Sequence, residues 1–139
     1  MIIWNAPVVA GSFPQLLPAA ASTFTTTGGS MTATLAGASG KLTFIEGFDL
    51  NFGSASAAGN CSITVTGLPV QLNYNQHLPA GSDTVAGTRF TALEVRFPEP
   101  LPASASNTGI VISSSSVALA TVGTLNVFGY QTPLAAGQT

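Results

Sequence analysis

A strict alternation of apolar and polar residues, repeatedly interrupted by proline and glycine, is the feature that most limits how this chain folds. The clearest run is Arg89–Phe97, in which apolar Leu93, Val95 and Phe97 alternate with charged Glu94 and Arg96. Successive side chains of a strand point to opposite faces, so the run predicts a strand with one buried and one solvent-exposed face. Three prolines follow between residues 98 and 102. Because proline donates no ladder hydrogen bond, we expect this strand to end at Phe97.

Similar short runs recur along the chain and predict roughly eight strands and no helix. They begin near Met31, Leu42, Cys61, Val70, Arg89, Ile110, Val117 and Leu125. Turns rich in glycine, proline and small polar residues separate them, with polar connections expected at Asn75–Gly87 and at the serine run Ser113–Ser116. The predicted fold class is all-β: one β-sandwich of antiparallel strands, jelly-roll-like, formed by residues 30–139.

The longest alternating run contains a charged residue at a core parity. Leu42, Phe44, Phe48, Leu50 and Phe52 share one parity, and Glu46 falls on it as well. One interpretation is that Gly47 marks a bend or bulge that turns Glu46 out to solvent. The other is a buried carboxylate paired with Lys41, Arg89 or Arg96, which is costly unless fully satisfied.

Residues 1–29 predict an extended N-terminal arm with one or two short strands. The segment has no charged residue, and Pro7, Pro14 and Pro18 exclude a long helix. Its large apolar side chains must be covered, either by a neighbouring molecule or by the chain's own sandwich. We expect partner contacts from six of them: Ile2, Ile3, Trp4, Phe13, Leu16 and Leu17. On the first alternative, deleting the arm leaves a folded domain and weakens attachment, with Trp4→Ala causing a disproportionate loss.

Charge is scarce. Asp, Glu, Lys and Arg make up 6% of the 139 residues, against about 25% in typical soluble domains. The three cations, Lys41, Arg89 and Arg96, are too few for binding nucleic acid, and no apolar run approaches the length of a membrane span. Edge strands of free proteins commonly carry lysine or other charges that discourage pairing, so this composition indicates a surface covered by partners.

Residues with catalytic or metal-binding chemistry are few. One cysteine, Cys61, and one histidine, His77, occur. Cys61 has core parity with Ile63 and Val65, and His77 is expected in an exposed loop. Serines lack a Gly-x-Ser-x-Gly elbow, and Glu94 lies on an outward strand face, so neither a serine hydrolase nor a glycosidase is expected. We therefore predict no enzyme activity, no metal and no cofactor.

The last third of the chain resembles a known family. The motifs are the strand end Phe97-Pro98-Glu99-Pro100, the small-residue link containing Asn107-Thr108 and the closing strand Asn126-Val127-Phe128-Gly129-Tyr130. Together they resemble the small β-sandwich decoration, or cement, proteins that tailed phages carry on their virions. The resemblance implies a structural virion protein, made in the bacterial host cytoplasm, that binds and stabilises the capsid lattice from its outer surface. It also implies a homo-oligomer, a trimer, in contact with the major capsid protein or another shell protein.

Two further functions remain open at this stage. Trp4, Tyr74 and Tyr130 would form a sugar platform if they cluster on one exposed face, giving a carbohydrate-binding or host-attachment module of a phage tail or fibre. A surface-filament subunit would complete its sheet by strand addition from another copy.

Overall fold

The computed structural model describes residues 15–16, 20–24, 29–53, 59–78, 90–115 and 122–134. These residues form nine β-strands and contain no helix, and so none long and apolar enough to cross a membrane. The strands are β1 (Gln15–Leu16), β2 (Ala20–Phe24), β3 (Met31–Leu35), β4 (Lys41–Gly53), β5 (Gly59–Thr66), β6 (Leu72–Leu78), β7 (Phe90–Pro102), β8 (Ile110–Ser114) and β9 (Val122–Pro133). The predicted all-β class is confirmed.

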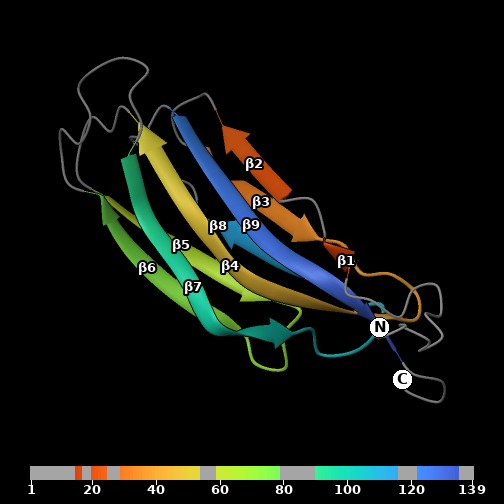
Figure 1. Ribbon diagram of the computed structural model, residues 1–139. Helices are drawn as coiled ribbons and strands as arrows, with labels where there is room; N and C mark the ends of the chain where they lie inside the picture. The colour runs from red at the N-terminus through yellow and green to blue at the C-terminus, as the bar shows by residue number, and fades with distance from the viewer. Residues whose placement is uncertain are drawn as a thin grey trace, which may run out of the picture.

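The strands form two antiparallel sheets that pack face to face (Figure 1). One sheet has the order β1-β9-β4-β7, with β2 also paired to β9, and the other has the order β3-β8-β5-β6. The pairs β2–β9, β3–β8, β4–β7 and β5–β6 are nested, so the chain runs as one long double-stranded ribbon folded over the core. This nesting is the jelly-roll arrangement that the alternating runs predict. The turn between β5 and β6 is the tip of the ribbon.

The core lies between the sheets and consists of inward-facing residues from five strands and one connection. Its buried members are Met31, Ala33, Leu35, Ile45, Phe48, Leu50, Phe52, Cys61, Ile63, Val65, Ala103, Ile110, Ile112, Leu125 and Val127. Cys61 has no exposed surface, which confirms its prediction as a core residue. Thr43 and Gln131 are buried polar members at one end; Gln131 Nε2 donates to Thr43 Oγ1 at 3.2 Å and to the Ala36 carbonyl at 2.8 Å.

The bulge predicted beside Gly47 is confirmed, and it corrects the expected parity of the neighbouring residues. The register with β7 and β9 shifts between Ile45 and Gly47, and Glu46 is the extra residue. Before the bulge the buried positions are Thr43 and Ile45, not Leu42 and Phe44. Phe44 therefore lies on the outer face, stacked on Tyr130 with ring centroids 5.0 Å apart. Glu46 is half-buried, and the Arg96 ion pairs in the described part are with Asp49 and Glu94.

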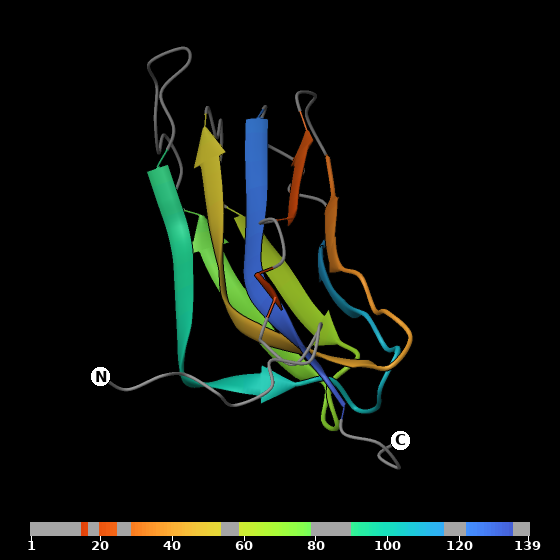
Figure 2. The same ribbon diagram turned by 45° about the vertical axis from the view of Figure 1, so that its right-hand side comes forward.

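The prediction that the prolines end the strand at Phe97 is wrong. β7 continues to Pro102 but bends sharply, and its ladder with β4 skips from Arg96 to Leu101 (Figure 2). β7 is an edge strand and has a neighbouring strand on one side only. Prolines are tolerated in such a strand at positions where no neighbouring strand requires a backbone N–H donor. Past the bend, the Ala103 N–H donates to the Thr43 carbonyl at 2.7 Å.

Two predicted connections prove to be partly strand. Asn75–Leu78 belong to β6 rather than to a polar loop, and Ser113–Ser114 belong to β8, where Ser114 is buried and its Oγ accepts from the Met31 N–H at 3.0 Å. Polar residues can occupy strands here because their side chains pair across neighbouring strands. The predicted strand near Val117 lies outside the described residues.

The described parts of segment 1–29 include two strands on the molecule's own sheet. Leu16 pairs with Tyr130, and Ala20–Phe24 pair with residues 123–127 of β9. Residues 1–14 and 17–19 lie outside the described part, and with them five of the six expected partner contacts: Ile2, Ile3, Trp4, Phe13 and Leu17.

Candidate partner-binding site

The tip of the folded ribbon is held rigidly against the connection between β7 and β8. Gly67 has φ of 89°, a conformation that glycine adopts readily, and an added Cβ would collide with the Gly109 carbonyl oxygen. The Ser104 N–H donates to the Gly67 carbonyl at 2.7 Å. The turn after Gly67 therefore has a fixed position relative to the end of β7.

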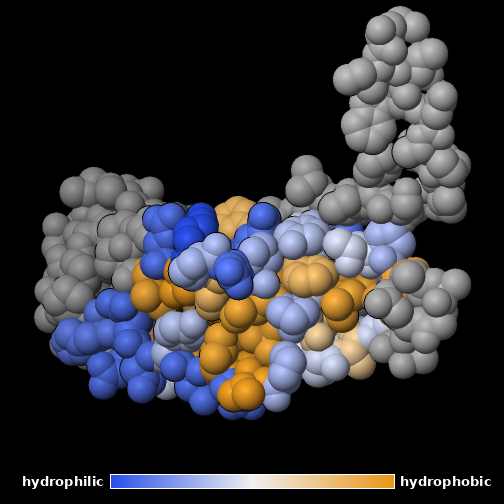
Figure 3. Space-filling view, turned by 60° about the horizontal axis from the view of Figure 1, so that its bottom comes forward, coloured by the Kyte–Doolittle hydropathy of each residue, from blue (hydrophilic) through white to orange (hydrophobic). Residues whose placement is uncertain are grey.

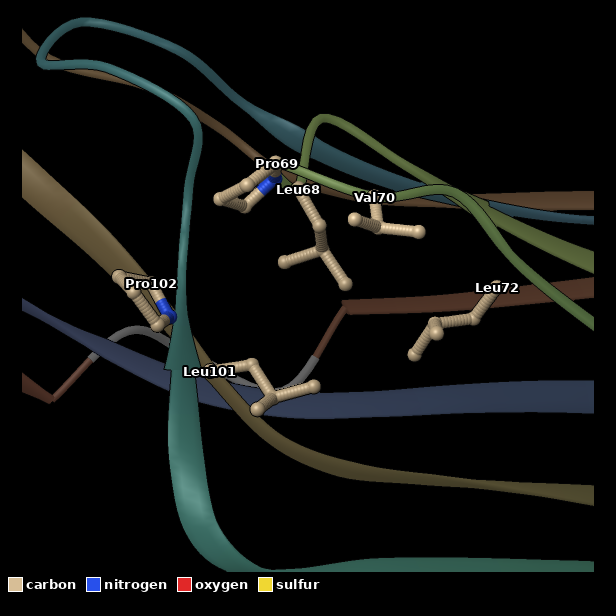
Figure 4. A pocket seen from close by; sticks show the side chains of 6 residues that line it. All are labelled: Leu68, Pro69, Val70, Leu72, Leu101 and Pro102. Atoms are coloured by element: carbon tan, nitrogen blue, oxygen red, sulfur yellow. The ribbon is translucent and has the colours of Figure 1, made fainter.

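An apolar pocket lies between this turn and the end of β7, with a volume of about 270 Å³. Its walls are Leu68, Pro69, Val70 and Leu72 on one side and Leu101 and Pro102 on the other. Figure 4 shows the side chains of Leu68 and Leu101 on the two sides of the space. Val70 is 71% exposed, unlike the other large hydrophobic residues of the described part. The lining offers hydrocarbon and almost no hydrogen-bonding group, so it suits an apolar occupant.

The pocket continues into a seam between the edge strands β6 and β7, which lie side by side (Figure 1). Partly buried hydrophobic side chains fill this seam and pack on the core: Leu72, Tyr74, Leu93, Val95 and Phe97. Tyr74 reaches across to Phe48 of the opposite sheet with an edge-to-face contact at 5.4 Å. Figure 3 shows hydrophobic residues gathered on this side of the molecule. Isolated exposed hydrophobic residues are ordinary, whereas a gathered patch marks an interaction surface.

The outer face of the four-stranded sheet is neutral and rich in hydrogen-bonding groups. Its strands carry no Asp, Glu, Lys or Arg. Side chains pair between β5 and β6: Ser62 Oγ donates to Asn75 Oδ1 at 2.9 Å, and His77 Nδ1 lies 2.9 Å from Asn60 Oδ1. His77 is exposed as expected, but on a strand rather than in a loop.

All six described charged residues lie on β4 and β7 of the other sheet. Asp49 Oδ1 accepts from Asn51 Nδ2 at 3.0 Å and from Asn126 Nδ2 at 2.6 Å. Arg96 lies 4.5 Å over the Phe128 ring and donates to the Phe48 carbonyl at 3.3 Å. This network fastens the edge strand β7 beside the bulge, and Arg96 sits 3.5 Å from Glu94 and 3.9 Å from Asp49. The groups of this network bind one another, so their role is structural.

The structure does not bring the predicted functional residues together. Tyr74 points between the sheets and Tyr130 lies on the outer face of the five-stranded sheet, so these two do not share a platform. Trp4, Ile2, Ile3, Phe13 and Leu17 lie outside the described residues, and Leu16 is described only by its pairing in β1. Within the described part, no group of three or more His, Cys, Asp or Glu residues is arranged to hold a metal ion.

The pocket residues were missed by sequence reasoning, although a signal was present. Turns are usually polar, yet Leu68-Pro69-Val70 places two large apolar side chains in a turn. Leu101 and Pro102 lie more than 30 residues away and come close only through the nested topology, which the local pattern does not give.

Comparison with known proteins leaves the function to be argued from these surfaces. No protein-family model matches the chain, and no curated protein is similar to it. Among solved structures, the chain is similar to one in the cryo-EM structure of the virus-like particle of the giant freshwater prawn Macrobrachium rosenbergii extra small virus. The identity is 12%, the TM-score is 0.48, and the alignment covers 94% of this chain and 85% of that chain.

Proposed function

We propose that this chain is a structural, non-enzymatic virion protein that assembles as a trimer and binds a phage capsid lattice as a decoration protein. The observation that carries the proposal is the apolar pocket with its exposed Val70, on a turn held in place by Gly67 and Ser104. A preformed apolar hollow continuous with an apolar seam is a surface for another protein, since covering it stabilises by roughly 25 cal/mol per Å² of apolar area. The phage origin and the trimeric state in this proposal rest on the motif resemblance.

The charge distribution supports a contact that does not depend on ion pairs. The four-stranded sheet is neutral, and three of the six charges described on the other sheet, Arg96, Asp49 and Glu94, pair with one another. Salt screens only the long-range part of attraction between exposed charges, and excluded salts such as sulfate strengthen apolar burial. Attachment to the shell should therefore persist in molar sodium chloride.

The test uses the purified protein and its parent particles. Light scattering at micromolar concentration should give a mass of three chains of 13.9 kDa, and co-sedimentation with particles stripped of the protein should persist in 1 M sodium chloride. A soluble monomer would contradict the assembly, and release by sodium chloride alone would contradict the apolar contact.

A carbohydrate-binding function is the second candidate, because the neutral hydroxyl and amide face of β5 and β6 offers hydrogen bonds without charge. Glycan-array binding that is lost in Asn75→Ala, with the particle contact intact, would favour it. A jelly roll serves both kinds of protein, so the fold does not choose between them.

A filament subunit would add a strand at an open sheet edge. β6 is an edge strand without proline or charged residues, so this alternative keeps one suitable edge. Filaments in electron micrographs of the purified protein would contradict the trimer and favour a filament subunit.

A further inference from the structure

The apolar pocket is too small for most free ligands and suits one or two side chains. Its volume of about 270 Å³ lies below the roughly 300–1,000 Å³ of typical small-molecule sites. Its lining has almost no polar surface to orient a polar ligand. The occupant that fits is therefore an apolar peptide segment.

The N-terminal residues of the chain have the required composition and reach. Residues 2–4 are Ile-Ile-Trp, and the whole segment before Gln15 lacks charge. Fourteen residues span up to about 46 Å when extended. A tryptophan flanked by isoleucines is the kind of anchor that dominates protein contacts.

The segment leaves the sheet at the edge opposite the pocket. Leu16 pairs with Tyr130, Tyr130 with Phe44, and Phe44 with Pro102, so four strands form one row that ends at the pocket. β1 and β7 are opposite edges of the sheet, three strand spacings or about 14 Å apart. In a ring of identical copies packed head to tail, the β1 edge of one copy faces the β7 edge of the next.

We infer that the pocket formed by Leu68, Val70, Leu72 and Leu101 receives the Ile2-Ile3-Trp4 segment of a second copy of this chain. The donor edge and the acceptor edge lie on opposite sides of each molecule, so the contact is heterologous, and the proposed trimer requires three such contacts to close into a ring. This inference rests on the proposed assembly and names the contact that holds it.

Trp4 is the sole tryptophan of the chain, so its fluorescence reports directly on this contact. The assembled protein should show blue-shifted emission, and Val70→Asp should shift the emission to the red and lower the mass to that of a monomer. Val70 lies in an exposed turn, so the fold should survive, which circular dichroism melting checks. Ser30→Asp is the matched control: it adds the same charge at an exposed position at the other end of the four-stranded sheet.

Mixing two variants identifies the acceptor. Val70→Asp keeps the arm and loses the pocket, whereas Trp4→Ala keeps the pocket and has no tryptophan to contribute to emission excited at 295 nm. Mixing them should restore blue-shifted emission, because the arm of the first docks in the pocket of the second. Red emission after mixing, or blue emission in Val70→Asp alone, would overturn the inference. If Val70→Asp remains a trimer that co-sediments with particles, the inference fails while the proposed function stands.

Discussion

Four glycines allow the cost of backbone conformation to be separated from the cost of crowding. Gly59 has neither a positive φ nor a neighbour within 4 Å of an added Cβ. Gly40 has φ of 69° with open space around it, and Gly47 has ordinary φ but would place a Cβ against the Val95 carbonyl oxygen. Gly67 combines φ of 89° with a collision against the Gly109 carbonyl oxygen. Alanine at each position tests one combination of the two costs.

The magnitudes follow from this geometry. Alanine restricts the unfolded chain and stabilises by about 0.4–1 kcal/mol where it fits, so Gly59→Ala should be neutral or slightly stabilising. A left-handed residue costs roughly 1–2 kcal/mol, which makes Gly40→Ala mildly destabilising. Crowding costs about 1–3 kcal/mol, so Gly47→Ala should lose about that much. Gly67→Ala adds both costs and should lose roughly 2–5 kcal/mol.

Urea denaturation measures the series, with equal m-values showing that the transition stays comparable. The expected order of stability is Gly59→Ala, Gly40→Ala, Gly47→Ala and then Gly67→Ala. If Gly67→Ala is as stable as Gly40→Ala, the tip moves freely away from Gly109, and the pocket wall is not fixed as described.

Two further predictions concern other parts of the fold. Burial raises the pKa of the Cys61 thiol, and its hydrogen bonds with Ser115 lower it by less, so the folded state holds this proton more tightly than the unfolded state. The resulting stability is present below the unfolded pKa of about 8.5 and is lost as the pH rises through the folded pKa. Between pH 7 and 10 the wild type should therefore lose more stability than Cys61→Ala, and equal losses would show that Cys61 does not titrate on unfolding. Asn126→Ala removes the 2.6 Å hydrogen bond to Asp49 and should lower the free energy of unfolding by roughly 1.5–3 kcal/mol in urea, whereas an unchanged midpoint would show that water replaces the amide.

The buried face of a strand was predictable where apolar and polar residues alternate without interruption along the whole strand. Met31, Ala33 and Leu35, and Cys61, Ile63 and Val65, alternate without interruption and are buried as expected. In β4 the bulge at Glu46 inverts the parity, so Phe44 and Phe48, four residues apart, face opposite sides. Gly47 signalled the bulge, but the pattern alone does not say on which side of it the core residues lie.

The prolines of β7 show a different limit of sequence reasoning. A proline excludes a central strand, and whether a strand is central depends on the order of the whole sheet. β7 lies at an edge, so the chain keeps its extended course through Pro98, Pro100 and Pro102 and merely bends. The bend carries Leu101 beneath the turn at Leu68, which is how the same prolines that seemed to end a strand come to form one wall of the pocket.

The rigidity of the two walls decides how strongly a pocket of this size can bind. An incoming segment loses conformational freedom when it docks, and a wall that also had to become ordered would add to that cost. Here the Gly67 carbonyl accepts from the Ser104 N–H, which fastens the turn to the connection at residues 103–104, and the Thr43 carbonyl accepts from the Ala103 N–H, which fastens that connection, directly after β7, to β4. The opening between the walls is thereby set before any partner arrives. Only the incoming segment must order, and a few apolar side chains then suffice to hold it.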